Sequence, residues 1–342
     1  MTIPVVVMGL GDIGRRIARA VLTEPSLELV GAVDRAPALV GRPLAEVLGA
    51  AAPDVVVTDS LTTAGAAARK ALAEFAGEEE APERAVLLHA TGSRLEQVAP
   101  ELTAALQAGF SVVSTCEELS CPWVRHPQLA DRLDRVAQKA GGTLVGVGVN
   151  PGFVLDRLVA TLGQATGKVE RVDGLRVVDA STRRESLQRK VGTGLAEEAF
   201  HAAVERGEVG HVGLMESAAL AAMGVGHACD EVDEEILPVL ALAPVDVPWG
   251  RVEAGQAAGV RQVARAFTEG REVARLELVI AVGAADPRDE IILHGTPALR
   301  LVIPGGTPGD DATAWTVVHA AQAVGQGAEP GLVTVLELPA GR

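Results

Sequence analysis

The sequence predicts an α/β protein, built from a doubly wound parallel sheet and a second domain of α+β type. Up to about residue 150, short β-rich runs alternate with longer helical patterns, which is typical of parallel strands joined by helices. A glycine-rich turn follows the first run at Gly9, and the alternation stops after Asn150. A chain of 342 residues also exceeds what one hydrophobic core usually fills, so two domains are expected.

The strands of the first domain are predicted where Val, Leu and Ala form nearly continuous runs, as in strands buried on both faces. The predicted strands are Ile3–Met8, Leu27–Val33, Asp54–Thr58, Ala85–His89, Ser111–Thr115 and Thr143–Val149. Helical periodicity between them predicts helices over Asp12–Leu22, Leu61–Phe75, Leu95–Ala108 and Pro127–Ala140. The acidic stretch Glu78–Glu80 predicts a solvated loop.

The domain boundary is predicted at Asn150-Pro151-Gly152, so that residues 1–150 form the first domain and residues 151–308 the second. In the second domain, strand patterns no longer alternate regularly with helices; they include Leu175–Val178 and Glu272–Val282. A last helix is predicted over Asp310–Val324. We expect this helix and the tail, about residues 309–342, to pack back on the first domain.

Composition and charge exclude several classes of protein. Apolar residues make up 48% of the chain and charged residues 22%, which indicates a packed globule rather than disorder. The net charge of −15, without a run of Lys and Arg, predicts no nucleic-acid partner. No apolar stretch reaches spanning length and no signal peptide is visible, so no membrane association is expected.

The cysteines indicate a reducing compartment. Cys116, Cys121 and Cys229 are odd in number and lack the spacing of a disulfide framework or a structural zinc site. No metal triad is apparent elsewhere either. We therefore expect a cytoplasmic protein without a metal site.

The glycine-rich turn is the strongest motif. The first predicted strand ends in Gly9-Leu10-Gly11-Asp12-Ile13-Gly14, directly before a helix. Gly9 permits a tight turn, Gly11 lets the backbone approach a pyrophosphate, and Gly14 lets the helix lie close to the sheet. Free N–H groups at the helix start favour phosphates. The pattern predicts a Rossmann-type dinucleotide-binding domain, with Gly9, Gly11, Asp12, Ile13 and Gly14 at the cofactor.

The end of the second predicted strand bears on the choice of nucleotide. Asp34 lies twenty positions after Gly14, where a carboxylate accepts hydrogen bonds from the adenosine ribose. Arg35 beside it favours the 2′-phosphate of NADP, unless it is a solvated loop residue. The cofactor is therefore NAD(H) and/or NADP(H).

Two adjacent carboxylates follow the fifth predicted strand. Glu117 and Glu118 lie at the carboxyl edge of the sheet, where open α/β sheets bind ligands. One interpretation is general acid–base catalysis beside the nicotinamide; the other is two acids in the first turn of a helix. Because successive residues point in different directions, we expect only one of the two in the pocket.

Further cofactor contacts are expected at the same sheet edge. His89, Ala90 and Thr91 end the fourth predicted strand, where a plain turn is the alternative. Asn150 either holds the nicotinamide carboxamide next to a hinge at Pro151-Gly152, or is an N-cap followed by Pro at the first helical position.

Several segments together resemble the 2,4-diaminopentanoate dehydrogenases and native amine dehydrogenases, which are distantly similar to dihydrodipicolinate reductase. The resemblance spans nearly the whole chain; it rests on Cys116–Trp123, Gly148–Phe153, Val178–Ser181, Arg183-Arg184, Leu187–Lys190, His211–Leu214, Glu216-Ser217, Gly309–Thr313 and Pro330–Leu332. It implies reductive amination of small aliphatic ketones or aldehydes by ammonia, and the reverse oxidative deamination, in a homodimer. The His-rich, Lys-containing signature of dihydrodipicolinate reductases is absent. A reductase activity of that kind is therefore the third choice, after amine dehydrogenase and 2,4-diaminopentanoate dehydrogenase activity.

The resemblance also assigns roles. Glu117 is the first choice for the acid–base group and Glu118 the second, a preference that comes from the register of similar homoserine dehydrogenases. Arg183 and Gln188 belong to a basic cluster that is either a solvated face or the place where a substrate carboxylate binds. Simple ketones need an apolar lining instead, for which Phe153, Leu214 and Met215 are candidates. A dehydrogenase of 2,4-diaminopentanoate and a non-catalytic NAD(P)-binding regulator stay open as alternatives.

Overall fold

The computed structural model describes residues 1–75, 81–181, 183 and 185–339. The chain forms two compact units: the first consists of Met1–Phe153 with Pro308–Arg342, and the second of Val154–Thr307. The predicted loop at Glu78–Glu80 lies outside the described residues.

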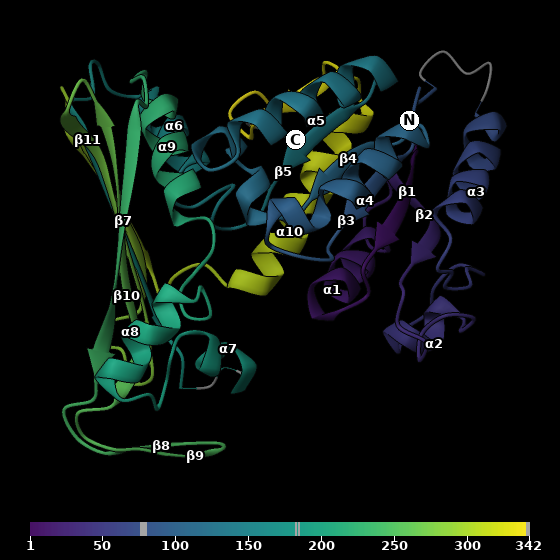
Figure 1. The fold of residues 1–342 in the computed structure, drawn as a ribbon. Helices are drawn as coiled ribbons and strands as arrows, with labels where there is room; N and C mark the ends of the chain where they lie inside the picture. Colours follow the sequence, from purple (N-terminus) through teal and green to yellow (C-terminus); the bar gives the residue numbers. More distant parts are fainter. Residues whose placement is uncertain (76–80, 182, 184, 340–342) are drawn as a thin grey trace. The chain divides into compact units, whose positions relative to one another are not determined.

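The first unit contains a parallel sheet of six strands in the order β14-β5-β4-β3-β1-β2 (Figure 1). The strands are β1 (Ile3–Met8), β2 (Leu27–Val33), β3 (Val86–His89), β4 (Ser111–Ser114), β5 (Thr143–Gly146) and β14 (Gly331–Val333). The helices are α1 (Asp12–Val21), α2 (Leu44–Leu48), α3 (Leu61–Glu74), α4 (Leu95–Gln107), α5 (Pro127–Ala140) and α10 (Gly309–Gly325), with the 3-10 turns η1 (Glu117–Leu119) and η2 (Pro122–Val124). The order of strands and crossover helices is the doubly wound parallel arrangement expected from the sequence.

Helices cover both faces of this sheet because its strands carry apolar side chains on both sides. Helices α3, α4 and α5 bury one face, where Leu87, Leu102 and Val112 belong to one hydrophobic cluster. Helix α1 packs on α10, which also contacts β3 and β4. The C-terminal helix is therefore part of the first unit.

One predicted strand is wrong. Residues 54–58 contribute only isolated bridges, Val33 to Thr58 and Pro43 to Val56. The backbone of residues 55–57 pairs instead with the segment that precedes it. Leu44 N–H donates to Val55 O, and Val57 N–H donates to Arg42 O. The sixth strand of the sheet is β14, which lies near the C-terminus.

The second unit has an α+β fold, as predicted. Its mixed sheet of six strands has the order β13-β12-β6-β11-β10-β7. These strands are β6 (Arg171–Asp179), β7 (Glu231–Leu240), β10 (Ala257–Thr268), β11 (Arg271–Ala281), β12 (Arg288–His294) and β13 (Leu299–Pro304), while β8 (Val245–Val247) and β9 (Gly250–Val252) pair separately. The helices are α6 (Arg157–Gly163), α7 (Glu185–Lys190), α8 (Glu197–Glu205) and α9 (Leu214–Gly224).

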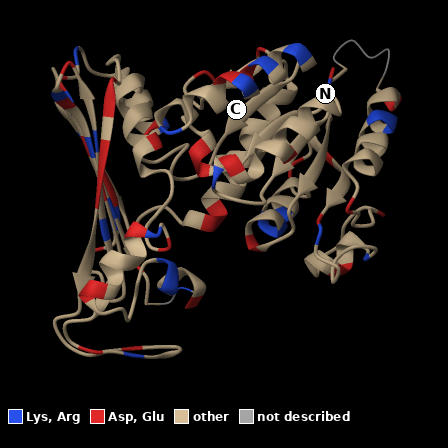
Figure 2. Cartoon of the chain, in the orientation of Figure 1, with Lys and Arg blue, Asp and Glu red and all other residues tan. Residues whose placement is uncertain are grey.

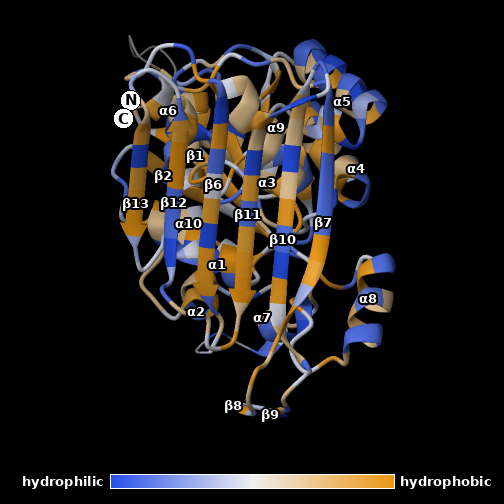
Figure 3. Cartoon of the chain, turned by 90° about the vertical axis from the view of Figure 1, so that its left-hand side faces the viewer, coloured by the Kyte–Doolittle hydropathy of each residue, from blue (hydrophilic) through white to orange (hydrophobic). Residues whose placement is uncertain are grey.

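Helix α9 covers one face of the second sheet, where it contacts β7, β10 and β11. Figure 3 views the opposite face, which combines apolar segments with polar ones along the strands. Arginines and acids form pairs across neighbouring strands there, as in Arg261–Glu277 and Arg265–Asp233, and Figure 2 shows charges of both signs along these strands. No helix among the described residues is long and apolar enough to cross a membrane.

Candidate active site

The turn after β1 has the geometry that its glycines predict. Gly9 has φ +90°, and a Cβ there would lie 2.5 Å from Ala90 O. A Cβ on Gly14 would lie 1.7 Å from Gly9 O, so α1 reaches this close to the turn only with glycine. A Cβ on Gly11 meets nothing within 4 Å, so open space lies over the middle of the loop. Close packing at Gly9 and Gly14 and open space at Gly11 form a cradle in which the backbone can approach a pyrophosphate.

The peptide groups of this cradle are fixed by two charged side chains. Leu10 N–H donates to Asp34 Oδ2 at 2.6 Å, and Leu10 O accepts from Arg15 Nε at 2.7 Å. Asp34 Oδ1 accepts in turn from Ala36 N–H at 2.8 Å. Asp34 therefore braces the loop, whereas Asp12 is exposed and Ile13 is half-buried at the start of α1. Free N–H groups and the positive dipole end of α1 are the features that bind phosphate.

The residues that end β3 form a polar network beside the cradle. His89 is buried, and its Nδ1 lies 2.8 Å from Ser114 Oγ while its Nε2 lies 2.7 Å from Thr91 Oγ1. Thr91 donates to Glu101 Oε2 at 2.7 Å, and Arg35 pairs with Glu101 Oε1 at 2.8 Å. Ala90 O borders Gly9, so these residues lie beside the glycine turn, and the contact of His89, Ala90 and Thr91 with the cofactor stays a prediction.

Glu118 is a structural anchor. Its side chain is 3% exposed; Oε1 accepts from the Arg94 guanidinium at 2.8 Å, and Oε2 accepts from Leu95 N–H at 2.7 Å. His126 Nε2 lies 3.2 Å from the same Oε2. Because Leu95 is the first residue of α4, the carboxylate caps that helix across 23 residues of sequence.

Opposing effects act on the Glu118 carboxyl. Burial raises its pKa, but the hydrogen bonds from Arg94 and Leu95 and the charges of Arg94 and His126 outweigh burial. The net result is a pKa below the usual value of a glutamate. Glu118 is therefore held as a carboxylate, which is suited to binding fixed donors rather than to exchanging protons near neutral pH.

Glu117 differs from its neighbour in exposure, since it is half-buried at the start of η1. It follows β4 by three residues, at the carboxyl edge of the parallel sheet. The preceding Cys116 is no candidate nucleophile, because burial and the neighbouring Glu117 charge raise the pKa of its thiol. Cys116 Sγ donates instead to Ser93 O at 3.2 Å.

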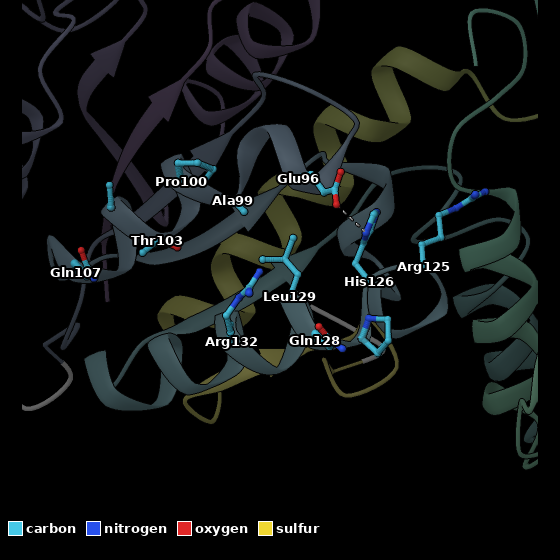
Figure 4. A pocket seen from close by; sticks show the side chains of 12 residues that line it. Glu96, Ala99, Pro100, Thr103, Gln107, Arg125, His126, Gln128, Leu129 and Arg132 are labelled. Carbon is cyan, nitrogen blue, oxygen red and sulfur yellow. Dashed lines mark ion pairs between the residues drawn. The ribbon is translucent and has the colours of Figure 1, made fainter. Parts of the chain in front are cut away.

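A groove of about 860 Å³ lies between α4 and α5 (Figure 4). It is lined by Glu96, Ala99, Pro100, Thr103, Ala104, Gln107, Arg125, His126, Pro127, Gln128, Leu129 and Arg132. None of these residues belongs to the glycine turn, so the groove is separate from the cradle. His126 connects the groove to Glu118, and in Figure 4 it also pairs with Glu96, at 3.8 Å.

Asn150 is not an N-cap. It is 6% exposed, and the next helix, α6, begins only at Arg157, where Asp156 Oδ1 accepts from Arg157 N–H at 2.6 Å. Turns at residues 151–156 delay the helix. The alternative role of Asn150 at the nicotinamide, and the hinge beside it, stay predictions, as does Phe153 in the substrate pocket.

The remaining substrate candidates belong to the second unit. Gln188 is fully buried, and its Nε2 donates to Ala180 O and Arg183 O while its Oε1 accepts from Trp249 Nε1 at 2.7 Å. Its amide thus holds the loop that carries Arg183. At the start of α9, Leu214 is buried and Met215 is half-buried. Their contact with substrate stays a prediction, and Arg184 lies outside the described residues.

Sequence reasoning missed three residues that organise this region. Glu101 contacts His89, Thr91 and Arg35, and Arg94 and His126 hold Glu118. Glu101 directly precedes the buried Leu102 of α4, so an acid at the border of the helix's apolar face was the available signal. Among the described residues, no group of three or more His, Cys, Asp or Glu side chains is placed to hold a metal ion.

The cradle and the parallel sheet define the first unit as a dinucleotide-binding domain of Rossmann type. A family model described as the N-terminus of dihydrodipicolinate reductase matches residues 3–95. The model of the 2,4-diaminopentanoate dehydrogenase C-terminal domain matches residues 153–342. The chain therefore belongs to the 2,4-diaminopentanoate dehydrogenase family, which confirms the resemblance seen in the sequence.

Individual relatives agree with this assignment. The chain is 26% identical to a 2,4-diaminopentanoate dehydrogenase from Acetoanaerobium sticklandii, over 99% of this chain and 94% of that protein. An amine dehydrogenase from Streptomyces virginiae is 29% identical over 56% of this chain and 51% of its own length. The solved structure of an amine dehydrogenase from Mycobacterium smegmatis has the same fold, with a TM-score of 0.80, 23% identity and coverage of 99% and 96%.

Proposed function

We propose that the protein is an NAD(P)H-dependent amine dehydrogenase that aminates small aliphatic ketones or aldehydes with ammonia and catalyses the reverse deamination. The observation that carries this proposal is the similarity to dehydrogenases that act on amines: nearly the whole chain matches a 2,4-diaminopentanoate dehydrogenase, and 56% of it matches an amine dehydrogenase. The glycine cradle and the acid at the end of β4 provide the two parts that the reaction requires from the first unit.

The cofactor requirement follows from the cradle. The backbone around Gly11 and the start of α1 would hold the pyrophosphate, and Asp34 or Arg35 would contact the adenosine ribose or its 2′-phosphate. When bound, the nicotinamide supplies the hydride that reduces the iminium carbon. NAD(H) and NADP(H) both fit this set of residues.

Glu117 is proposed as the acid–base group. Its carboxylate accepts a proton from an ammonium ion and so releases ammonia, which adds to the carbonyl carbon; one proton of the added nitrogen moves to the carbonyl oxygen and gives the carbinolamine. Glu117 then returns a proton to the departing hydroxyl, which leaves as water, and its negative charge stabilises the iminium cation. The position of Glu117 at the carboxyl edge supports this role, and the anchoring of Glu118 by Arg94 and Leu95 makes Glu118 the less favoured candidate.

The closest alternative is the deamination of 2,4-diaminopentanoate itself, which the full-length relative favours. Such a substrate carries a carboxylate, for which Arg183 is the proposed partner. A dihydrodipicolinate reductase activity is less favoured, because the model of that family matches only residues 3–95. A regulator that binds NAD(P) without turnover is the remaining alternative.

A substrate screen tests these possibilities. Purified protein is assayed by nicotinamide absorbance with ammonia and a series of small ketones and aldehydes, and in reverse with simple amines and 2,4-diaminopentanoate. Turnover of simple amines supports the proposal, and turnover of the diamino acid alone supports the alternative. Dinucleotide binding without any turnover would contradict both. Omitting ammonia is the control for plain carbonyl reduction.

The working unit is proposed to be a homodimer formed through the face of the second sheet shown in Figure 3. Half-buried apolar side chains on this face, such as Leu175 and Val279, lie among cross-strand ion pairs. Burying such a surface against a second copy removes apolar area from water. Val279→Arg should therefore give monomers in sedimentation, whereas Val56→Arg, at an exposed position of the first unit, should not. A dimer that survives Val279→Arg would exclude this interface.

The compartment is proposed to be the cytoplasm. Cys116 and Cys229 are free thiols in the structure. Free thiols persist in reducing compartments. Localisation of a tagged full-length chain tests this proposal, and recovery in a secreted fraction would contradict it.

A further inference from the structure

Glu101, on α4, is the centre of a polar cluster at the carboxyl ends of β2 and β3 that the proposed reaction does not use. Oε2 of Glu101 accepts from Thr91 Oγ1 at 2.7 Å and lies 3.2 Å from His89 Nε2. Oε1 lies 2.8 Å from Arg35 NH1. The Glu101 carboxylate therefore joins His89 and Thr91, at the end of β3, to Arg35, the second residue after the end of β2.

The direction of these hydrogen bonds fixes the state of the cluster. Cys116 N–H donates to Ser114 Oγ at 3.1 Å, and the same oxygen lies 2.8 Å from His89 Nδ1. Because Thr91 Oγ1 donates to Glu101 Oε2, it accepts from His89 Nε2, which faces both Thr91 and Glu101. Glu101 receives donors on both oxygens, which rigidly orients its carboxylate toward Arg35.

Glu101 is a permanent negative charge in this cluster. The hydrogen bond from His89 lowers its pKa most; burial opposes this, and the Thr91 hydrogen bond and the charges of His89 and Arg35 lower it further, to about 2. Its side chain is only 14% exposed, whereas that of Arg35 is 72% exposed. The carboxylate is thus fixed, and the guanidinium that it binds faces solvent.

The cluster directly borders the cofactor cradle. A Cβ placed on Gly9 would lie 3.0 Å from Thr91 Cγ2, and Thr91 donates to Glu101. Asp34, which braces Leu10, directly precedes Arg35. Arg35 therefore follows Asp34 in sequence and pairs with Glu101 in space, at the end of the strand where the adenosine ribose of a dinucleotide binds in this fold.

We propose that Glu101 determines the choice between NAD and NADP, because it holds Arg35 in an ion pair that a 2′-phosphate must break. This inference rests on the proposed dinucleotide-dependent function. A 2′-phosphate competes with Glu101 for the single guanidinium and is repelled by the Glu101 charge. NAD has no 2′-phosphate and meets neither obstacle. Glu101 is therefore a specificity residue that acts through Arg35, outside the motif that usually reports nucleotide choice.

The test is a double-mutant cycle on cofactor affinity. Dissociation constants of NADH and NADPH are measured by fluorescence titration for the wild type, Glu101→Gln, Arg35→Gln and the double variant. Glu101→Gln frees Arg35 and removes one charge, so we expect NADPH to bind about tenfold more tightly relative to NADH. In the Arg35→Gln background, the same substitution should change the ratio of dissociation constants much less.

The matched control is Glu96→Gln, which removes an exposed carboxylate from the same helix. This control should leave the ratio at the wild-type value. If Glu101→Gln does not fold, Glu101→Asp replaces it, since the shorter carboxylate weakens the contact with Arg35 and must shift the ratio in the same direction.

Specific results would overturn the inference. One is an equal change for NADH and NADPH in the Glu101 variants, which would make Glu101 a purely structural residue. Another is an undiminished effect of Glu101→Gln when Arg35 is absent. A wild-type protein that binds neither dinucleotide would instead overturn the proposed function, so the two failures are distinguishable.

Discussion

Asp34 accepts a hydrogen bond from the backbone N–H of Leu10 at 2.6 Å, so the acid expected at the ribose also fixes the peptide in the middle of the glycine turn. The two roles use the same side chain for different purposes. A hydrogen bond needs only an acceptor oxygen, whereas discrimination against a 2′-phosphate needs a negative charge. Asparagine keeps the first property and removes the second, which makes the roles separable by experiment.

Asp34→Asn should weaken NADH binding relative to NADPH. The amide oxygen can still accept from Leu10 N–H, but the charge that repels a 2′-phosphate and binds ribose hydroxyls strongly is gone. We expect a relative change of about tenfold, which corresponds to about 1.4 kcal/mol. The melting temperature should stay near that of the wild type. Equal losses with both nucleotides would show that Asp34 braces the loop without reading the ribose.

Glu118→Gln should reduce stability. The buried carboxylate accepts charged hydrogen bonds from Arg94 and caps α4 at Leu95, and an amide leaves Arg94 and His126 facing a neutral group. Hydrogen bonds to charged groups contribute about 1.5–3 kcal/mol, so a loss of that size in the free energy of unfolding is expected. Urea unfolding measures it. Glu96→Gln, at an exposed position near the start of α4, is the control and should change little.

Stability should also fall in mild acid. The folded-state pKa of Glu101 is about 2 and that of Glu118 is below the usual value, so both carboxyls favour the folded state above the unfolded pKa of about 4.3. That contribution is lost as the pH falls from about 5 toward the folded pKa values, with a slope of up to about 1.4 kcal/mol per pH unit for each group. Urea unfolding between pH 6 and pH 3 measures the slope.

Glu101→Gln should make that pH dependence shallower, because one carboxyl with a lowered pKa is removed. The comparison uses the slope rather than the stability at neutral pH, so it is insensitive to a general loss of packing. A slope identical to that of the wild type would show that Glu101 is not held ionised by His89 and Thr91.

The sequence was most informative where local pattern and tertiary pairing agree. Strands β1, β3 and β4 are buried on both faces, so β1 is apolar throughout, while β3 and β4 carry the buried apolar runs Val86–Leu88 and Val112-Val113. The glycine turn was predictable because Gly9 and Gly14 are required by local geometry. The same reasoning failed at residues 54–58, where an apolar run pairs with residues 42–44 instead of extending the sheet. Nothing within the run itself specifies its partner.

The long strands of the second unit were harder to predict. Strand β7 groups its acids in the first half, and two of them, Asp233 and Glu235, pair with Arg265 on β10, thirty or more residues later. Similarly, the role of Glu118 depends on Arg94 and Leu95, which precede it by more than twenty residues. Neither feature can be predicted without knowing which segments of the chain contact each other in the fold. Sequence proximity had made Glu117 and Glu118 appear equivalent.

The mechanism makes its strongest prediction for Glu117. Glu117→Gln should retain folding and dinucleotide binding but lose most amination activity, because an amide cannot transfer the protons. General acid–base catalysis contributes about 10²–10⁴-fold, so kcat should fall by that factor at saturating ammonia and carbonyl substrate. The melting temperature should change little, because Glu117 is half-buried whereas Glu118 is the buried anchor.

The comparison of Glu117→Gln with Glu118→Gln decides between the two carboxylates, since one change should act on rate and the other on stability. A stable, fully active Glu117→Gln beside an inactive but stable Glu118→Gln would reverse the assignment. If both variants kept the wild-type kcat, neither carboxylate would transfer protons, and ammonia addition would have to depend on another group. The pH profile of kcat adds an independent readout, because replacing the true acid–base group removes its limb of the profile, whereas loss of a helix cap leaves the profile in place.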